Sequence, residues 1–324
     1  MAAKTRNIRV VNDNSKSGWV NGYWFEKVLL NNKEKLIKDG KLITFTIPKK
    51  TSLTVDGLIR MLSYVNQLQD NGYKIKLDFL NEDSPAMGYL DRLGFFQRLH
   101  GKVKVKPKPP EISGSQKYHG TNGTLVELAV VNSVEEPSAD LSDRLSNAII
   151  TFLKKERPNL SAANILRLDT IYKTIFYELI NNIHEHSKTQ LDGLVGLQAY
   201  GGTTPRIEIV VCDSGVGLLE TIKDSLQTHN AKYSAFSDLM LVKEMFNEGI
   251  SSKNPEEYAG SGLKTCFTQA KKMGSGLTIR INKSQFSIRE MDIENDDIGQ
   301  LRFMDELLPV SGTFICFSIP VFLS

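Results

Sequence analysis

Hydrophobic residues recur at helical spacing along one long segment in the second half of the chain. The residues that share this spacing are Ile165, Leu168, Ile171, Tyr172, Ile175, Leu179 and Ile183. A helix with this pattern buries one broad face. At about 100° per residue, Glu178 and Asn182 project together, one turn apart, along the edge of that face. A carboxylate and an amide beside a core are costly to bury unless partners satisfy them, so they mark either a functional site or a pair of structural hydrogen bonds.

The segments around this helix alternate between strand and helix patterns, which is typical of an α/β fold. Strands are predicted at 125–131, 194–200, 207–212, 277–281 and 313–319, and helices at 141–155, 237–246 and 263–272. About forty residues separate Gly217 from Gly260, and a connection of that length between core elements predicts a lid. The segment 286–306 is charged and has no assignable pattern.

The first part of the chain carries a smaller strand–helix–strand–helix pattern. Its strands are predicted at 43–47 and 73–79, and its helices at 54–71 and 86–93. Residues 1–40 are polar apart from an aromatic cluster, which we expect to pack onto the domain that follows. The cluster consists of Trp19, Tyr23, Trp24 and Phe25.

Between residues 101 and 117, Lys102, Lys104, Lys106 and Lys108 alternate with valine and proline. This composition predicts a solvated linker. The predicted organisation is therefore an α/β domain at 1–100, a linker at 101–118 and a second α/β domain at 119–324.

Composition and charge add limits to this picture. The chain has 324 residues, enough for two domains, and its 40% hydrophobic and 24% charged residues are ordinary for a globular protein. A net charge of +3 is too small to predict a nucleic-acid partner, and the lysine-rich linker has no aromatic residue to stack on bases. Cys212, Cys266 and Cys316 show no C-x-x-C spacing or disulfide framework, which favours the reducing cytoplasm. We expect no membrane span and no signal peptide, because no apolar run approaches roughly 20 residues.

Two predicted turns contain glycines. One follows a predicted strand, and the other precedes a predicted helix. The strand at 207–212 runs into Asp213-Ser214-Gly215-Val216-Gly217, and Gly260-Ser261-Gly262-Leu263-Lys264-Thr265 opens the helix at 263–272. The second turn is not a P-loop, because Leu263 stands where G-x-x-x-x-G-K-[ST] requires its second glycine. The first is not a dinucleotide fingerprint, because Leu218-Leu219-Glu220 follows Gly217.

Together with Glu178 and Asn182, these turns resemble the motifs of the GHKL superfamily of ATP-binding domains. This superfamily includes gyrase B, MutL, histidine kinases, the large heat-shock chaperone and anti-sigma-factor kinases. The resemblance covers the N box (Glu178 to Asn182), the first glycine box (Asp213 to Gly217), the second (Gly260 to Gly262) and a closing element at Gly312-Thr313. It implies a two-layer α/β sandwich for the C-terminal domain, a mixed sheet with helices on one face, and the binding of ATP with Mg²⁺.

The same resemblance implies a role for each motif residue. Asp213 would accept a hydrogen bond from the exocyclic amine of adenine, and Gly215 and Gly217 would let the backbone turn close to the purine. Asn182 would ligate Mg²⁺, and Glu178 would orient or deprotonate the attacking water or hydroxyl. The second glycine box would contact the phosphates at a helix N-terminus. The remaining candidate cofactor-binding residues are His186, Lys253, Gly260, Ser261, Gly262, Leu263, Lys264 and Thr313.

Residues 38–100 resemble STAS-like domains, the small α/β modules that pair with anti-sigma-type GHKL kinases. These domains often offer a phosphorylatable serine where the second strand gives way to its helix, and Thr54-Val55-Asp56-Gly57 occupies that kind of place. Asp56 is therefore either at the acceptor position or a helix-start residue favoured by the helix dipole. The resemblance implies a protein partner for this N-terminal domain.

The leading hypothesis is ATP binding with slow Mg²⁺-dependent hydrolysis, in which the lid changes shape and acts as a switch on a protein partner. Two alternatives stay open: an anti-sigma-type protein serine/threonine kinase and a nucleotide-gated interaction module without hydrolysis. A histidine-kinase role is disfavoured, because His100, His119 and His229 do not lie in a two-helix dimerisation hairpin. A homodimer is left open, and no membrane or nucleic-acid partner is expected.

Overall fold

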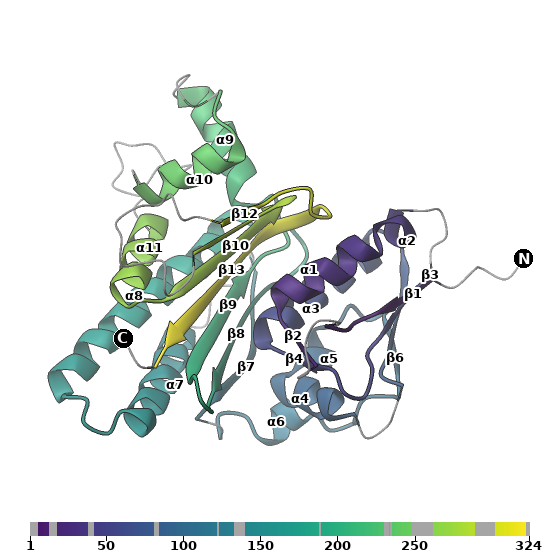
Figure 1. Cartoon of the computed structure of the whole chain (residues 1–324), viewed down its shortest axis with the longest axis horizontal. Helices are drawn as coiled ribbons and strands as arrows, with labels where there is room; N and C mark the ends of the chain where they lie inside the picture. Colours follow the sequence, from purple (N-terminus) through teal and green to yellow (C-terminus); the bar gives the residue numbers. More distant parts are fainter. Residues whose placement is uncertain are drawn as a thin grey trace, which may run out of the picture. The chain divides into compact units, whose positions relative to one another are not determined.

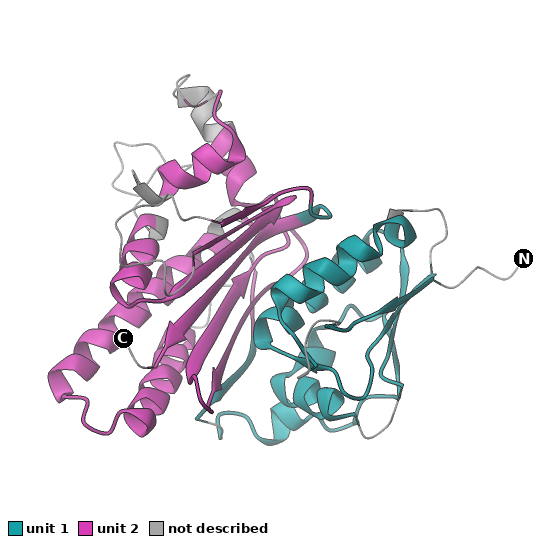
Figure 2. Ribbon diagram, in the orientation of Figure 1, with its two compact units in different colours: residues 1–128, 307–310 teal, residues 129–306, 311–324 magenta. Residues whose placement is uncertain are grey.

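The computed structural model describes residues 6–12, 18–37, 42–80, 84–121, 123–132, 140–187, 189–229, 233, 235–247, 262–288 and 302–321. The chain divides into two compact units, which Figure 2 shows in different colours. Unit 1 comprises residues 1–128 and 307–310, and unit 2 comprises residues 129–306 and 311–324. Both units combine helices with β-sheet, so the expected α/β class is confirmed.

Unit 1 is built on a four-stranded parallel sheet (Figure 1). In order across the sheet, its strands are β1 (Arg6–Arg9), β3 (Leu42–Thr46), β5 (Lys74–Asp78) and β6 (Lys104–Lys106). Phe45 on β3 pairs with Ile8 on β1 and with Leu77 on β5, and all three side chains are fully buried. The alternating apolar residues of the sequence therefore line one face of this sheet. A separate two-stranded sheet joins β2 (Trp19–Val20) to β4 (Ser52–Leu53) in parallel.

Helices occupy the connections between these strands, and one further helix follows β6. They are α1 (Gly22–Asn31), α2 (Lys33–Ile37), α3 (Val55–Asp70), α4 (Pro85–Leu93), α5 (Phe95–Arg98) and α6 (Gly114–Lys117). Helix α3 begins after Thr54, whose hydroxyl accepts a hydrogen bond from the Gly57 N–H. The predicted apolar face of α3 is buried. The sequence pattern does not predict α1. The aromatic cluster packs only in part, because Phe25 is buried whereas Trp19 and Tyr23 are exposed.

The segment expected to be a linker belongs to unit 1. Residues 104–106 form the edge strand β6, paired with β5, and residues 114–117 form α6, which packs against α4. The Gly114 N–H donates a hydrogen bond to Asp91 Oδ2 at 2.8 Å. The alternating lysines that suggest a solvated linker are equally compatible with an edge strand, which is exposed along one side. The division between the two units falls within β7 (Leu125–Val131).

Asp56 lies in the first turn of α3 and ties this helix to α1. Its Oδ2 accepts a hydrogen bond from the Gly22 N–H at 2.8 Å, and its Oδ1 accepts one from Arg60 Nε at 3.1 Å. Arg60 Nη1 also donates to Glu26 Oε1 at 3.2 Å, and both of these side chains are buried. The helix-start interpretation of Asp56 is therefore confirmed, and the same carboxylate satisfies an N–H at the start of α1.

A seven-stranded sheet forms the centre of unit 2 (Figure 1). Its order is β12 (Arg302–Met304), β11 (Ser284–Ile288), β10 (Gly276–Asn282), β13 (Val310–Pro320), β9 (Arg206–Cys212), β8 (Gly193–Tyr200) and β7. Strand β9 runs antiparallel to both of its neighbours, so that Cys212 pairs with Phe314 on β13 and with Leu194 on β8. The predicted strands of this part are all present. Strands β11 and β12 include residues from the segment that the sequence leaves unassigned.

Three helices of unit 2 cover one face of this sheet. Helix α8 (Ala162–His186) lies between α7 (Leu141–Glu156) and α11 (Gly262–Lys272). Helix α10 (Asp238–Asn247) packs against α11 and against α9 (Leu218–His229), which the sequence pattern does not predict. The predicted apolar face of α8 is fully buried only in its second half, from Tyr172 to Ile183.

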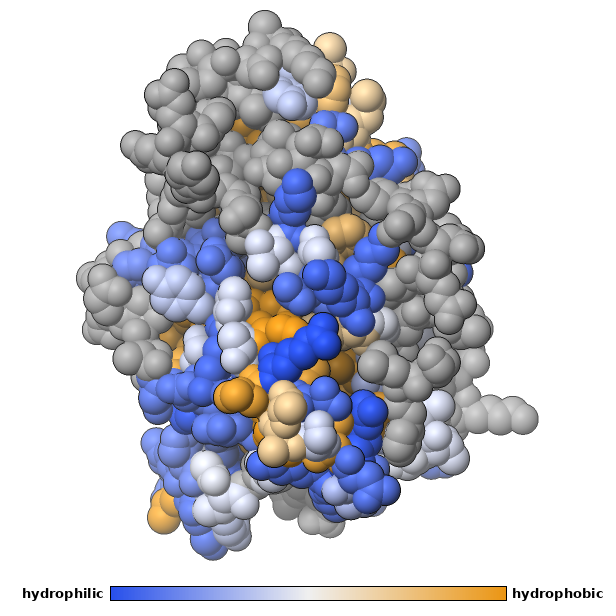
Figure 3. Space-filling model, turned by 90° about the vertical axis from the view of Figure 1, so that its left-hand side faces the viewer, coloured by the Kyte–Doolittle hydropathy of each residue, from blue (hydrophilic) through white to orange (hydrophobic). Residues whose placement is uncertain are grey.

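Figure 3, which views the left-hand side of Figure 1, shows apolar residues near the middle of that face with hydrophilic residues around them. Among the described side chains of α8, two large hydrophobic ones are exposed, Leu166 and Tyr177. Within the described part of the chain, none of the helices is long and apolar enough to span a membrane.

Candidate functional site

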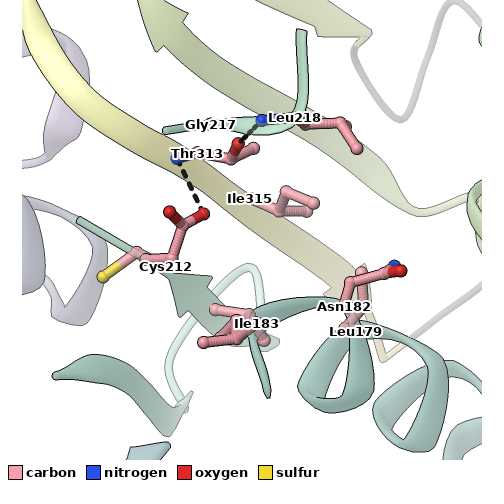
Figure 4. A pocket seen from close by; sticks show the side chains of 10 residues that line it. Leu179, Asn182, Ile183, Cys212, Gly217, Leu218, Thr313 and Ile315 are labelled. Carbon is pink, nitrogen blue, oxygen red and sulfur yellow. Dashed lines mark hydrogen bonds between the residues drawn. The ribbon is translucent and has the colours of Figure 1, made fainter. Parts of the chain in front are cut away.

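A pocket in unit 2 lies where α8, β9 and β13 meet (Figure 4). Its empty volume is about 430 Å³, including space open to solvent. The residues that line it are Leu179, Asn182, Ile183, Val211, Cys212, Asp213, Gly217, Leu218, Thr313 and Ile315. Most of the lining is apolar, and Asp213, Asn182 and Thr313 supply its polar side chains. An apolar pocket with a few convergent polar groups is the usual form of a small-molecule site.

Asp213 stands at the point where β9 passes into the first glycine turn. Its Oδ1 accepts a hydrogen bond from the Gly215 N–H at 2.8 Å, and its Oδ2 accepts one from the Thr313 N–H at 2.9 Å. Figure 4 marks the second of these bonds with a dashed line. The carboxylate is thus fixed between two backbone segments. An ionised carboxylate offers about four acceptor positions, so it retains capacity for a ligand donor.

Thr313 connects this carboxylate to the start of α9. Its hydroxyl accepts a hydrogen bond from the Leu218 N–H at 2.7 Å, and its own N–H donates to the Asp213 carboxylate. The Asp213 N–H in turn donates to the Thr313 carbonyl at 2.9 Å. Asp213, Thr313 and Leu218 therefore form one hydrogen-bonded unit, although 100 residues separate Asp213 from Thr313 along the chain.

The surroundings of Asp213 act in opposite directions on its ionisation. Burial raises the pKa of its carboxyl group above the usual value, and the hydrogen bonds from Gly215 and Thr313 partly oppose this. A ligand donor that pairs with the carboxylate would favour its ionised form. The geometry thus places a hydrogen-bond acceptor in a largely apolar pocket.

Gly215 is required by a close contact within the protein. A Cβ atom at this position would lie 1.6 Å from the Ser187 carbonyl oxygen, which accepts a hydrogen bond from the Val216 N–H at 3.2 Å. The sequence predicts that Gly215 makes room for a purine, whereas in the structure the nearest space is taken by the end of α8. Gly217 does line the pocket, and its φ of +88° favours glycine.

Glu178 and Asn182 lie one turn apart on α8, as predicted, but their surroundings differ. Asn182 lines the pocket, whereas Glu178 does not. The carboxylate of Glu178 is close enough to Cys266 on α11 to act on its thiol: burial, together with this charge, raises the pKa of Cys266 to about 12. Asn182 therefore lies at the pocket, whereas the Glu178 carboxylate lies near Cys266 of α11.

The structure brings only some of the predicted residues together. Asn182, Asp213, Gly217 and Thr313 meet at the pocket. Lys253, Gly260 and Ser261 lie outside the described residues, as do the side chains of His186 and Leu263. The backbone of Gly262 opens α11, and Lys264 follows in its first turn. The roles predicted for these positions remain predictions.

The apolar lining of the pocket is not identified by the sequence. Leu179, Ile183, Val211, Cys212 and Ile315 follow ordinary helix and strand periodicity, and each is buried. Such residues look like any other core residues. The useful signal is their position one to three residues from Asn182, Asp213 or Thr313.

Replacing Thr313 with valine should lower the free energy of unfolding of unit 2 by about 1–3 kcal/mol, because the part-buried Leu218 N–H would lose its acceptor. Thr313→Ser should retain most of the stability. Urea denaturation measures both, with Thr174→Val on the exposed side of α8 as a matched control. A Thr313→Ser protein as unstable as Thr313→Val would assign the effect to the methyl group.

Among the described residues, no group of three or more His, Cys, Asp or Glu side chains is arranged to hold a metal ion by itself. Comparison of the chain with models of known protein families gives no match, and comparison with curated proteins gives none either.

Proposed function

We propose that unit 2 binds ATP together with Mg²⁺ and hydrolyses it slowly, and that the nucleotide state acts as a switch on a protein partner. The observation that carries the proposal is the Asp213 carboxylate, held by the N–H groups of Gly215 and Thr313 inside a mostly apolar pocket. Adenine has apolar faces and an exocyclic amine that donates hydrogen bonds. A pocket with apolar walls and one fixed acceptor fits such a base.

The arrangement of helices and strands in unit 2 supports the same proposal. The sheet of unit 2 has helices on one face, and the N box lies on α8 beside the strand that leads into Asp213. This arrangement fits the two-layer α/β sandwich implied by the resemblance to GHKL domains. For unit 1, the strand–helix alternation fits a STAS-like module, and we propose that it contacts the protein partner.

The phosphate end of the site is proposed from Asn182 and from the start of α11. An amide oxygen is a hard ligand, and Mg²⁺ is usually held by one or two protein groups plus substrate phosphates, so a single protein ligand at the pocket is compatible with a shared ion. Bound Mg²⁺ would neutralise phosphate charge. The N–H groups at the start of α11, with Lys264 in its first turn, would attract the phosphates. Glu178 would accept a proton from the attacking water.

Asp213→Asn tests the recognition of the base. One acceptor oxygen would become an N–H donor facing other donors, so ATP affinity should fall roughly tenfold to a hundredfold. Titration calorimetry measures this, with the exposed Asp192→Asn as the matched control. The nucleoside triphosphate of unsubstituted purine lacks the exocyclic amine. Comparing its binding with that of ATP tests the amine contact separately from any effect of the substitution on folding. This analogue should bind the wild-type protein more weakly than ATP, and this difference should shrink in Asp213→Asn.

Equal affinity of the wild-type protein for ATP and for the amine-free analogue would contradict the assignment of Asp213. The reaction itself is tested with γ-labelled ATP and candidate partner proteins. Label released as phosphate supports hydrolysis, label retained on protein indicates a kinase, and intact ATP in every mixture indicates a switch without turnover.

A further inference from the structure

The face of the unit 1 sheet opposite its apolar side carries residues in three rows, of which Thr44 and Thr46 are buried. Residues paired between parallel strands point to the same side of a sheet, so each row follows from the register. The rows are Arg9–Thr46–Asp78–Lys106, Asn7–Thr44–Lys76–Lys104 and Leu42–Lys74. We call these ten residues the open sheet face.

The open sheet face concentrates positive charge. It holds five cationic residues and one carboxylate, Asp78, whereas the whole chain has a net charge of only +3. Arg9, Lys74, Lys104 and Lys106 are exposed, and Lys76 is partly exposed. The ten residues of this face therefore carry a formal charge of +4, which exceeds the +3 of the whole chain.

The one carboxylate on this face is already engaged. Lys76 Nζ contacts Asp78 Oδ2 at 2.6 Å. Burial acts to raise the pKa of Asp78, yet the pKa is lowered by the Lys76 hydrogen bond, the Leu80 N–H and the charges of Lys76 and Lys106. Within the described residues, Arg9, Lys74 and Lys104 form no ion pair.

The arrangement is also unfavourable for the isolated sheet. Lys76 and Lys104 are direct partners on neighbouring strands, and like charges directly opposite one another destabilise a sheet. Lysines on an edge strand can protect a sheet from pairing with other chains, which would account for Lys104 and Lys106 on β6. That explanation does not extend to Lys74 and Lys76, because β5 is an inner strand.

We propose that the open sheet face binds an acidic surface of a partner protein. Carboxylates placed along the rows would neutralise the unpaired cations and relieve the repulsion between Lys76 and Lys104. A protein surface can also present a cation opposite Asp78, whereas a nucleic-acid backbone is negative throughout. The face has no aromatic side chain on which bases would stack. This inference names the chemistry of the partner in the proposed switch, and in that respect rests on the proposed function.

The test compares two variants with the same change in net charge. Lys74→Glu with Lys104→Glu alters the open sheet face, and Lys154→Glu with Lys155→Glu alters exposed lysines at the end of α7. Fluorescently labelled poly-L-glutamate serves as the probe, in fluorescence anisotropy titrations of the full chain without nucleotide. Binding to the wild-type protein should weaken as salt rises from about 50 to 200 mM. The face variant should bind at least about tenfold more weakly, and the α7 variant within about twofold of the wild type.

The remaining measurements separate the possible explanations. Thermal unfolding should show no loss of stability in the face variant, because Lys104→Glu would stand opposite Lys76. Equal weakening in both variants, or no binding of poly-L-glutamate, would overturn the proposal. Tighter binding of a duplex DNA than of poly-L-glutamate would overturn the choice of a protein partner. ATP affinity should be unchanged in both variants, and failure of the wild-type protein to bind ATP would count against the proposed nucleotide function alone.

Discussion

Replacing Glu178 with glutamine should lower ATP turnover by about 10²–10⁴-fold while leaving ATP affinity nearly unchanged. Glutamine keeps the shape of the side chain but cannot accept a proton from the attacking water. Because Glu178 lies outside the pocket lining, its loss should have little effect on binding. Phosphate release measures turnover, and calorimetry with the non-reacting variant measures affinity.

Asn182→Ala provides the complementary result. This amide lines the pocket, so its removal should weaken ATP binding in the presence of Mg²⁺ and change binding in EDTA much less. Asn147→Ala, on the exposed side of α7, is the matched control. Turnover at the wild-type rate in Glu178→Gln would exclude Glu178 as the base. A wild-type protein with neither phosphate release nor protein labelling would favour the non-hydrolysing switch.

Gly215→Ala should lower the free energy of unfolding of unit 2 by about 3 kcal/mol or more. The added Cβ would lie 1.6 Å from the Ser187 carbonyl oxygen, so either the end of α8 or the glycine turn must move. That movement would also displace Asp213, whose Oδ1 is held by the Gly215 N–H, and ATP affinity should fall with stability.

Gly201→Ala is the control for this prediction. No heavy atom lies within 4 Å of a Cβ built on Gly201, in the loop between β8 and β9, so its stability should change by about 0.5 kcal/mol or less. Urea denaturation followed by circular dichroism measures both variants. A Gly215→Ala protein as stable as the wild type would show that α8 is not tightly positioned by this turn.

Periodicity predicts the elements of unit 2 with a buried face, because packing there decides which residues are apolar. The helix predicted at 141–155 is α7 at Leu141–Glu156, and the strand predicted at 125–131 has the same bounds as β7. The pattern fails where burial is weak. Strand β6 has one neighbouring strand and only three residues, so its Lys-Val alternation resembles a linker, and α9 follows a glycine turn without a strong start signal.

Only part of the site can be predicted, because spacing in the sequence identifies candidate residues but not where their side chains point. Asp213 and Thr313 are predicted as separate motif residues, whereas their mutual hydrogen bonds depend on the pairing of β9 with β13. The helical spacing of Glu178 and Asn182 is correct. Their different surroundings depend on the position of α11, which no local pattern contains.

The position of β13 between β9 and β10 has a consequence for biosynthesis. Thr313 leaves the ribosome 100 residues after Asp213, which corresponds to roughly 5–20 s at ordinary rates of translation. During that interval β9 lacks the strand that completes its hydrogen bonding, and the Asp213 carboxylate lacks the N–H donor of Thr313. The nascent chain would then expose an unpaired strand to chaperones or to other chains. Under the proposed function, nucleotide would bind tightly only after β13 is inserted, so ATP would select chains in which synthesis has passed residue 320.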